Sequence, residues 1–410
     1  MGLNPPALLK SKKEWLLFSG CIVAVVCIQL LFYYHSYKQF IDNERVTLDA
    51  TVITQYPKND YLVLKLQSGH KTFYTTSRED LKDLSGYDVQ MFLFLQSVSI
   101  SFFDYLSTFY APSFILRAYT QQQPAHEYIK NQHEDTLFQE FFSAIFLAKP
   151  ISSDLRQSVA SLGVSHLIAL SGFHLGILSG ILYFILRPPY RFFQKRYFPY
   201  RFELLDLGFI VAIVLGAYLI FTDFPPSLVR AYGMFFIGWL LVLFGVSIFT
   251  YRFLFFVVMV LIAIDPRLLF SLGFFFSVCG VFYIYMVLDW FKGSSKAVIT
   301  LAITTWVFIA MLPITHYFFP LTSYYQLISP ILTLLFSIFY PVALFLHTVG
   351  FGDLATFTIP TDLHSWDFTT PTWFYYSYIL LSLLAIDDRF KPLLLCVALG
   401  FAVTLFLSHS

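Results

Sequence analysis

Charged residues are scarce in this 410-residue chain, and cysteines are scarcer still. Only 12% of the residues are charged and the formal net charge is +1, whereas an ordinary soluble domain is about a quarter charged. Bulk charge therefore gives no signal for nucleic-acid binding, although a pore can confine its cations to the lumen. All four cysteines lie in apolar runs: Cys21, Cys27, Cys279 and Cys396. That placement excludes a disulfide framework or a zinc site in the polar stretches.

The signatures of several enzyme classes are also missing. The sequence has no P-loop, no G-x-S-x-G and no H-E-x-x-H, since "HEYIK" and "HEDTL" both lack the second histidine. We therefore expect no ATPase motor, no metal, no cofactor and no enzyme activity. Ser171 and His174 could form a dyad for an intramembrane hydrolase. At i, i+3 on one helix, however, their side chains would lie parallel rather than converge, which weakens that alternative.

Apolar residues are what the chain has in abundance, at 57% hydrophobic and 20% aromatic. Residues 15–34 are about long enough to cross a hydrocarbon core of roughly 30 Å. No clear small-residue cleavage site follows, so we interpret this run as a retained anchor rather than a signal peptide. Further spans are predicted at about 166–186, 204–221, 227–246, 252–264, 268–289, 297–318, 323–349, 371–386 and 391–408. The span at 323–349 contains Pro330 and Pro341, which predict a break inside the membrane.

Between the anchor and the bundle lies a polar insert. Residues 46–97 contain short alternating runs such as "VTLDATVI" and "YLVLKLQ" separated by turn residues, a pattern typical of strands in a small OB-like barrel. The sequence thus predicts a polytopic α-helical membrane protein with a small all-β (OB-like) extracytoplasmic insert. The predicted domains are a tail and anchor (1–37), the β module (38–97), an interfacial helical connector (98–165) and the helical bundle (166–410).

One face of the β module has the residue types that bind single strands. Basic residues alternate with aromatic ones in its sequence: Lys58, Lys65, Lys71 and Arg78 beside Tyr56, Tyr61, Phe73 and Tyr74. Aromatic stacking together with a positive groove is how such barrels hold single-stranded nucleic acid. The alternative is a structural cap with solvated charges, and the sequence leaves both open.

Loop charges predict the orientation. Residues 187–201, "RPPYRFFQKRYFPYR", are rich in arginine and contain no acid, which indicates a cytoplasmic loop. The N-terminus is then cytoplasmic, and residues 38–165 are extracytoplasmic. The same parity requires residues 321–350 to enter and leave on one face, as a broken hairpin would.

The run 165–186 has an unusual polar end. Four hydrogen-bonding residues occupy its predicted outer end: Ser165, His166, Ser171 and His174. A separate ridge of small residues, spaced by four, predicts close packing against another helix: Gly172, Gly176 and Gly180. Either the polar residues simply bond neighbouring carbonyls, or they open outward as a polar mouth.

The position of Arg230 favours the interpretation that the polar residues open outward as a polar mouth. It lies early in the span that begins "PPSLVRAYG", at the depth of the polar helix end. An arginine within a spanning segment is costly and usually faces a bundle interior or water. Asp223 lies just outside, so a structural ion pair is the alternative. We take Arg230, His174, Ser171 and His166 as candidates for a translocation pathway.

The segment "DLRQSVASLGVSHLIALSGFHLGIL" (154–178) resembles the signature of ComEC-type competence proteins, the inner-membrane channels for DNA in natural transformation. "FPPSLVRAYGMF", which contains Arg230, "DPRLLFSLGFFFSVCGVFYI" (265–284) and the stretch 319–350 resemble later family segments in the same order. Phe275 replaces the family's glutamine, which puts a polar role there in doubt. The family's C-terminal metallo-β-lactamase-like domain has no counterpart before Ser410, so nuclease activity is not expected.

The resemblance implies passage of single-stranded DNA from the periplasmic or outer face into the cytoplasm of a bacterium. Membrane lipid, an extracytoplasmic DNA receptor, and a cytoplasmic helicase or DNA-binding proteins are the implied partners. The lumen of such a path must be wet, because a polyanion cannot cross hydrocarbon. Three alternatives stay open: a transporter for a small solute, an intramembrane hydrolase and a membrane scaffold.

Overall fold

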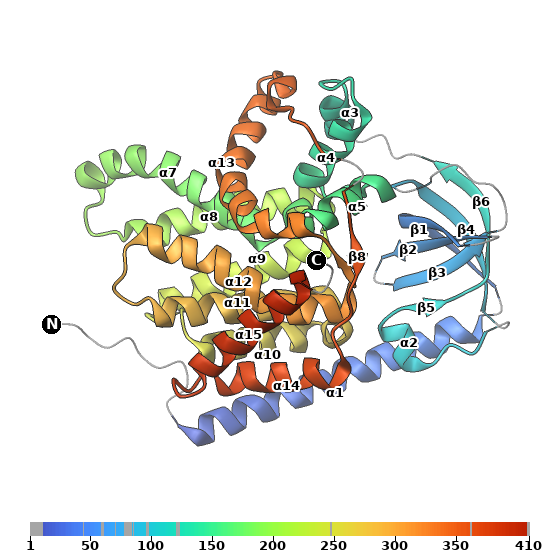
Figure 1. Cartoon of the computed structure of the whole chain (residues 1–410), viewed down its shortest axis with the longest axis horizontal. Coiled ribbons are helices and arrows are strands. Elements are labelled where there is room, and N and C mark those ends of the chain that lie inside the picture. The colour runs from blue at the N-terminus through green and yellow to red at the C-terminus, as the bar shows by residue number, and fades with distance from the viewer. Residues whose placement is uncertain are drawn as a thin grey trace.

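Two unlike parts follow one another along the chain, a small β module and a bundle of helices (Figure 1). The computed structural model describes residues 11–43, 45–58, 61–69, 71–77, 84, 86–95, 98–119, 124–246, 248–360 and 363–407. Helix α1 (Lys12–Asp42) runs along the bundle and ends beside the β module. Ser11 caps its start, because the hydroxyl accepts the Glu14 N–H while the Glu14 carboxylate accepts the Ser11 N–H.

The β module is a six-stranded sheet that closes on itself. Its strands are β1 (Arg45–Lys58), β2 (Tyr61–Ser68), β3 (Lys71–Ser77), β4 (Asp88–Phe94), β5 (Phe109–Tyr110) and β6 (Ser113–Tyr119). The order is β5-β3-β2-β1-β4-β6, and only the β3–β5 pair is parallel among the described pairs of this sheet. The chain passes from edge strand β5 to the opposite edge strand β6 through Ala111 and Pro112 alone, so the two edges meet and form a small barrel.

Alternating side chains fill the barrel, as the period of a strand requires. Leu64, Leu66 and Phe73 of β2 and β3 have no exposed surface. Phe40, near the end of α1, packs into the same core. The short helix α2 (Phe102–Leu106) contributes to this contact, since the ring of Tyr105 lies 5.6 Å from that of Phe40. Helix α1 and the barrel are therefore one packed unit.

The barrel extends beyond the boundary expected from sequence. Residues 98–119 were predicted to lie in the membrane interface, but they supply α2, β5 and β6. Their polar groups are used in the sheet: Thr75 Oγ1 lies 2.7 Å from Ser113 Oγ, and the Ala111 N–H donates to the Tyr74 carbonyl. An apolar stretch that contains polar residues and a proline here marks strands that close a barrel rather than an interfacial helix.

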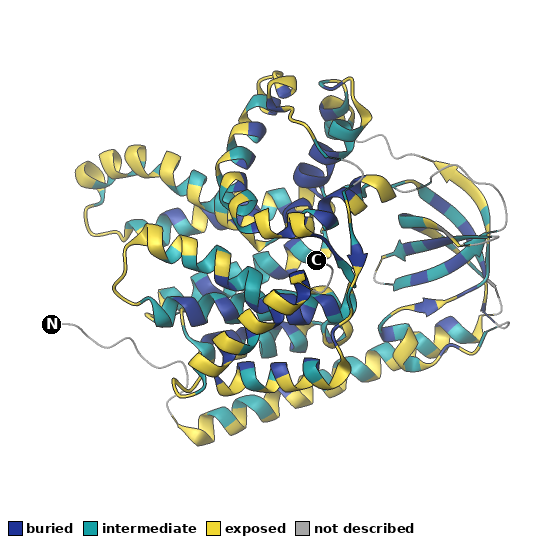
Figure 2. Ribbon diagram, in the orientation of Figure 1, coloured by how far each residue is buried: buried dark blue, intermediate teal, exposed yellow. Residues whose placement is uncertain are grey.

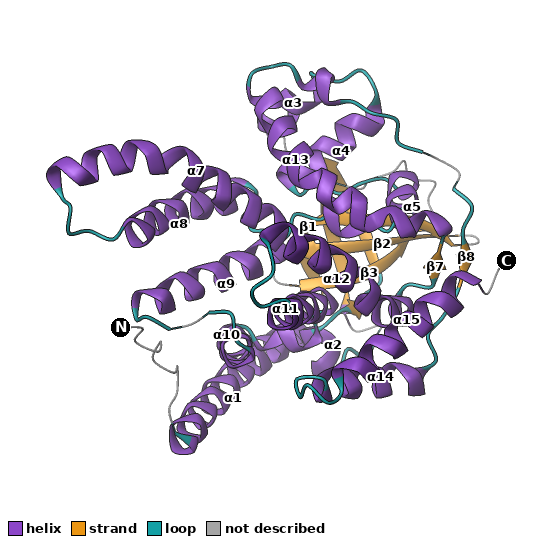
Figure 3. Ribbon diagram, turned by 60° about the vertical axis from the view of Figure 1, so that its left-hand side comes forward, coloured by secondary structure: helices purple, strands orange, loops and turns teal. Residues whose placement is uncertain are grey.

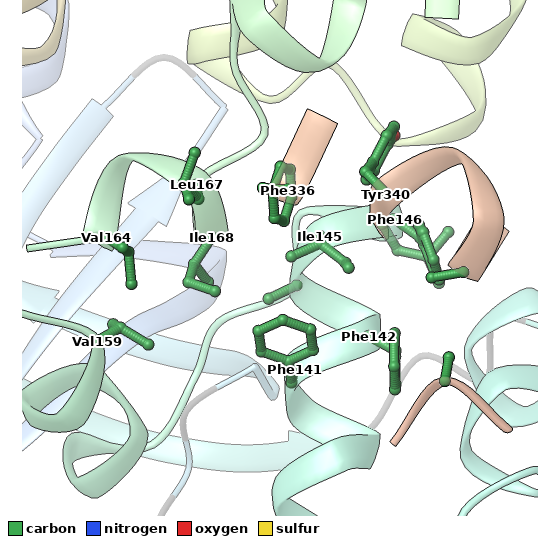
Figure 4. Close-up of a cluster of buried hydrophobic side chains, with 14 of the residues drawn as sticks. Phe141, Phe142, Ile145, Phe146, Val159, Val164, Leu167, Ile168, Phe336 and Tyr340 are labelled. Atoms are coloured by element: carbon green, nitrogen blue, oxygen red, sulfur yellow. The ribbon is translucent and has the colours of Figure 1, made fainter. Parts of the chain in front are cut away.

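Four short helices connect the barrel to the bundle: α3 (Pro124–Lys130), α4 (Thr136–Leu147), α5 (Ser153–Ser161) and α6 (Ser165–Ile168). Helix α4 is the most buried of these in the described chain, and its rings Phe141, Phe142 and Phe146 lie with Phe336 and Tyr340 in one apolar cluster (Figure 4). This cluster joins the connector to α13 of the bundle.

The bundle is built from α7 (Gly172–Tyr197), α8 (Glu203–Phe221), α9 (Pro226–Leu243), α10 (Tyr251–Ile264), α11 (Leu272–Trp290), α12 (Lys296–Phe318), α13 (Ser329–Thr348), α14 (Thr372–Leu384) and α15 (Lys391–Leu407). Short elements link them: η2 (Pro266–Phe270), β7 (Leu321–Thr322), η3 (Tyr324–Ile328), η4 (Gly352–Ala355) and β8 (Trp366–Asp367). Five helices contact one another in a closed cycle, from α7 to α9, α11, α12, α13 and back to α7 (Figure 3).

Six helices in the described chain are long and apolar enough to cross a membrane: α1, α8, α9, α11, α12 and the η3–α13 stretch. Much of the bundle surface is exposed (Figure 2), and large apolar residues stand on it, such as Ile338 at 68% and Leu16 at 73% exposed. A soluble monomer rarely shows apolar surface on this scale. The predicted fold class, a polytopic helical protein with a small β insert, is confirmed.

Two predicted spans differ in detail. The run 166–186 is not one helix, because the chain leaves helical geometry between α6 and α7, and α7 is not among the six apolar helices. The broken hairpin expected at 321–350 is absent, since α13 is continuous from Ser329 to Thr348. Pro330 lies in the first turn of α13, where a missing N–H removes no helical hydrogen bond. Pro341 is accommodated inside the helix.

Candidate functional site

Helix α7 begins at Gly172, and Ser171 precedes it as the N-cap residue. The Ser171 Oγ accepts the Phe173 N–H at 3.3 Å, and His174 Nδ1 accepts the Ser171 N–H at 3.3 Å. This is a capping box with histidine in the place usually taken by Glu or Gln. Ser171 Oγ also lies 3.2 Å from His174 Nδ1, so the prediction that these side chains lie parallel on one helix is wrong. This contact is part of the helix cap.

Both histidines of this segment contact α13. His174 is fully buried, and its ring centroid lies 5.2 Å from that of Phe336 and 4.8 Å from that of Tyr340. His166, on α6, is exposed, and its Nε2 lies 3.3 Å from Thr333 Oγ1. The polar residues expected on one helix are thus divided between α6 and α7, on either side of the break.

Among the described residues, the glycine ridge of α7 makes one of its three expected contacts. A Cβ built on Gly172 would lie 3.5 Å from the Cβ of Ala231 on α9, an ordinary packing distance. At Gly176 and Gly180 nothing lies within 4 Å of such a Cβ among the described residues. The ridge therefore brings α7 to α9 at the first turn and faces open space further along.

Arg230 lies in the second turn of α9 and is buried, with 8% of its surface exposed. Its side chain forms no hydrogen bond and no ion pair with any residue that the structure describes, and its Nε is fully buried. The ion pair with Asp223, the alternative interpretation of Arg230, is not formed in the described chain. Asp223 adopts a left-handed backbone conformation (φ 62°) at the end of α8, where it is exposed and interacts electrostatically with Lys149.

Three helix starts meet around Arg230. The neighbouring residue Ala231 packs on Gly172, the first residue of α7. The Arg230 guanidinium lies against Gly273, the second residue of α11: a Cβ there would be 3.0 Å from Arg230 Nη2. The N-termini of α7, α9 and α11 are therefore adjacent, and each carries the positive end of a helix dipole. The side chains diverge, because His174 turns to α13 and Arg230 to α11.

Gly273 was not among the site residues predicted from sequence, although it lies in the "SLGFFF" stretch. A glycine inside an apolar helix is by itself a weak signal, because it can be tolerated there without a packing role. Phe275, two residues later, packs with its ring centroid 6.3 Å from that of Phe318 on α12, so this position is apolar as the sequence suggested.

A second candidate site lies on the barrel. Strands β1, β2, β3 and β5 form a pocket of about 540 Å³, lined by Tyr56, Lys58, Tyr61, Val63, Tyr74, Thr76 and Tyr110. The structure thus brings together Tyr56, Lys58, Tyr61 and Tyr74, as the sequence predicted, and adds Tyr110, which could be found only once β5 was placed.

Of the other residues predicted for this face, one lies near the pocket and two lie elsewhere in the described chain. Lys65 Nζ lies 5.7 Å from the ring centroid of Tyr74, and burial, with the nearby charge of Arg156, lowers the pKa of Lys65. Phe73 is fully buried in the barrel core, and Lys71 Nζ lies 3.9 Å from the centroid of Phe40 near the end of α1. Arg78 lies outside the described residues. A rim of four tyrosines with two lysines remains.

Comparison with known proteins identifies the family. The model of the competence protein family, described as "Competence protein", matches residues 148–407, which is more than half of the chain. The chain belongs to the competence protein family. Together with its six apolar helices, this makes it a multi-pass membrane protein with a role in DNA uptake or competence. No curated protein and no solved structure is significantly similar to the chain.

The matched region contains the helical bundle and begins before α5, whereas α1 and the barrel precede it. Arg230, Ser171, His174, His166 and Gly273 all lie inside it. The tyrosine pocket of the barrel lies outside it, so its role must be argued from its own residues.

Proposed function

We propose that this competence protein is a channel that passes single-stranded DNA from the outer face of the bacterial inner membrane into the cytoplasm. Arg230 is the observation that carries the proposal. A buried cation in a membrane helix is expensive unless it is paired or meets water or a ligand. In the described chain Arg230 has no carboxylate partner, and it lies where three positive helix ends meet. The positive charge of Arg230 and of these helix ends favours binding of a polyanion.

The orientation is part of the proposal. Residues 187–201 lie at the end of α7 and in the loop to α8, and Arg187 and Arg191 there share Glu203, with distances of 2.6 Å. We place this basic end in the cytoplasm by the positive-inside rule. The N-terminus is then cytoplasmic and the barrel extracytoplasmic, at the opposite end of the bundle from the basic loop (Figure 1). Membrane lipid covers the apolar flanks.

The barrel serves this function as a receiving surface. Its strand order, with a parallel β3–β5 pair, supports the OB-like assignment. Four tyrosine rings and Lys58 around one pocket offer stacking and a positive charge, which together hold unpaired bases without sequence preference. Double-stranded DNA offers no free base faces, so this pocket favours a strand whose complement has been removed.

The chain supplies a path rather than a motor or a nuclease. The driving force comes from a cytoplasmic helicase or from DNA-binding proteins that trap the entering strand, and an extracytoplasmic receptor delivers it. Ser171 and His174 cap a helix in this proposal, and no enzyme activity is assigned to them.

Gene deletion tests the function directly. Labelled DNA is offered to competent cells, and DNA bound outside is measured separately from DNA in the cytoplasm. Deletion is expected to leave outer binding intact and abolish cytoplasmic entry, and the intact gene supplied in trans restores it. Entry that survives deletion refutes the channel. A transporter for a small solute predicts unchanged DNA entry, so the same experiment separates that alternative.

A further inference from the structure

The side chain of Arg230 packs against the first turn of α11. The guanidinium lies over Gly273, the second residue of a 19-residue helix. The contact is close enough that a Cβ at Gly273 would lie 3.0 Å from Nη2, 3.7 Å from Cζ and 3.9 Å from Nη1. All three atoms of the guanidinium end therefore face this glycine, and only a residue without a side chain leaves them undisturbed.

Two backbone donors of the same turn are open. The Phe274 N–H donates to Ser271 Oγ at 3.3 Å, and the Phe275 N–H donates to the Ser271 carbonyl at 3.0 Å. The N–H groups of Leu272 and Gly273 have no partner in the described chain. Gly273 is exposed, so a ligand can reach this turn. Unsatisfied amides at a helix start, together with the dipole, attract anions.

The charges here have the same sign, which is unfavourable without a ligand. A cation is stabilised at the C-terminus of a helix and destabilised at its N-terminus. Several other cations of the described bundle are paired with acids, such as Arg267 with Asp265 and Lys391 with Asp289. Among the residues that the structure describes, no charged side chain interacts appreciably with Arg230, which is more than nine-tenths buried. A bound anion is the missing counter-charge.

We propose that Arg230 and the free amides of Leu272 and Gly273 bind a phosphodiester group of the strand in transit. This inference rests on the proposed function and names the chemistry of one step on the path. The planar guanidinium donates two parallel hydrogen bonds to phosphate oxygens, and the amides supply further donors. A phosphodiester carries one negative charge, so one cation and a helix end neutralise it without holding the strand too tightly to release.

The variants separate this site from general stability. Arg230→Gln removes the charge, Arg230→Lys keeps the charge and loses the fork, and Gly273→Ala pushes a methyl group against the guanidinium. Gly280→Ala is the matched control, because it adds the same methyl to the same helix where nothing lies within 4 Å. Each purified protein carries Tyr74→Ala as well, so that the barrel pocket does not dominate binding.

Binding of fluorescent oligo(dT) is measured by anisotropy at several salt concentrations. Arg230→Gln is expected to weaken binding about 10- to 100-fold, as for loss of a charge-assisted contact, and to reduce the salt slope by about 0.7. Gly273→Ala is expected to show a smaller loss, and Gly280→Ala none. Inorganic phosphate is expected to compete more strongly than chloride at equal ionic strength.

Unchanged affinity and salt slope in Arg230→Gln would overturn the site, as would equal competition by phosphate and chloride. DNA entry after gene deletion tests the proposed function separately from this site. If deletion of the gene abolishes DNA entry while Arg230→Gln supports normal entry, the channel stands and this site falls. If entry survives deletion, the channel itself falls whatever the binding data show.

Discussion

Two arginines at starts of bundle elements show opposite solutions to the same problem. Arg267, in η2, makes a double contact with Asp265, with Nη2–Oδ2 at 2.7 Å and Nε–Oδ1 at 2.8 Å. Its guanidinium lies 5.0 Å from the ring centroid of Tyr33 on α1, and the Tyr33 hydroxyl donates to Asp265 at 3.3 Å. Arg230 has neither an acid nor an aromatic face in the described chain. The ion pair of Arg267 joins η2 to α1 through Tyr33, whereas we propose that Arg230 is left unpaired to bind a ligand.

The largest difference is expected from truncating each arginine. Arg230→Ala removes no hydrogen bond or ion pair of the described chain, so protein abundance should stay near the wild-type level while DNA entry falls about 10- to 100-fold. Arg267→Ala should lower abundance, because it removes the cation that neutralises Asp265 and leaves the Tyr33 hydroxyl as the remaining side-chain donor to it in the described chain. Quantitative blotting of membranes and counting of cytoplasmic label measure both. An equal loss of abundance in Arg230→Ala would make it a structural residue and break the comparison.

Removing Asp265, the acid paired with Arg267, tests the Arg267 half of the comparison. Asp265→Ala leaves Arg267 and the Tyr33 hydroxyl without their shared acceptor and is expected to destabilise the purified protein by about 1–3 kcal/mol. Thermal unfolding in detergent, read through tryptophan fluorescence, measures the loss. Tyr33→Phe, which removes one hydroxyl, is the milder control. If Asp265→Ala unfolds like the wild type, this pair contributes no net stability despite its geometry.

The contrast also shows which parts of this molecule a sequence can predict. Period and length were enough for the anchor, the first strands and most spans, because lipid and a sheet each impose one periodicity over many residues. The prediction of one helix over 166–186 was wrong at Ser171. Within an apolar run, a serine that caps a helix cannot be told from one inside a helix. The Asp223 pair failed for a related reason: nearness in sequence and depth does not fix the direction of a turn. Gly273 becomes visible only when two distant helices are placed side by side.

A smaller effect is expected at the tyrosine pocket, where we propose that stacking contributes more to ligand binding than charge does. Tyr74→Ala removes one ring of the pocket and should weaken oligo(dT) binding about 5- to 100-fold, with little change in salt slope. Tyr87→Ala is the matched control, because Tyr87 is also exposed on the barrel, at 39%, but does not line the pocket. Anisotropy with the otherwise wild-type protein measures both. Equal losses in the two variants would argue for a solvated structural cap instead of a binding face.

The smallest effect is expected on the pH dependence of stability, at a half-buried histidine near two lysines that stays neutral in the fold. Burial, and then the charges of Lys130 and Lys149, lower the pKa of His126 on α3 to about 4. An unfolded chain binds this proton below about pH 6.5, whereas the fold resists it until about pH 4, so stability should fall as the pH drops across that window. His126→Gln cannot take up the proton, and its unfolding temperature should therefore decline less than that of the wild type between pH 7 and pH 4.5. Parallel declines would mean that His126 accepts the proton as readily in the fold as in the unfolded chain, and that a third cation is tolerated there without a partner.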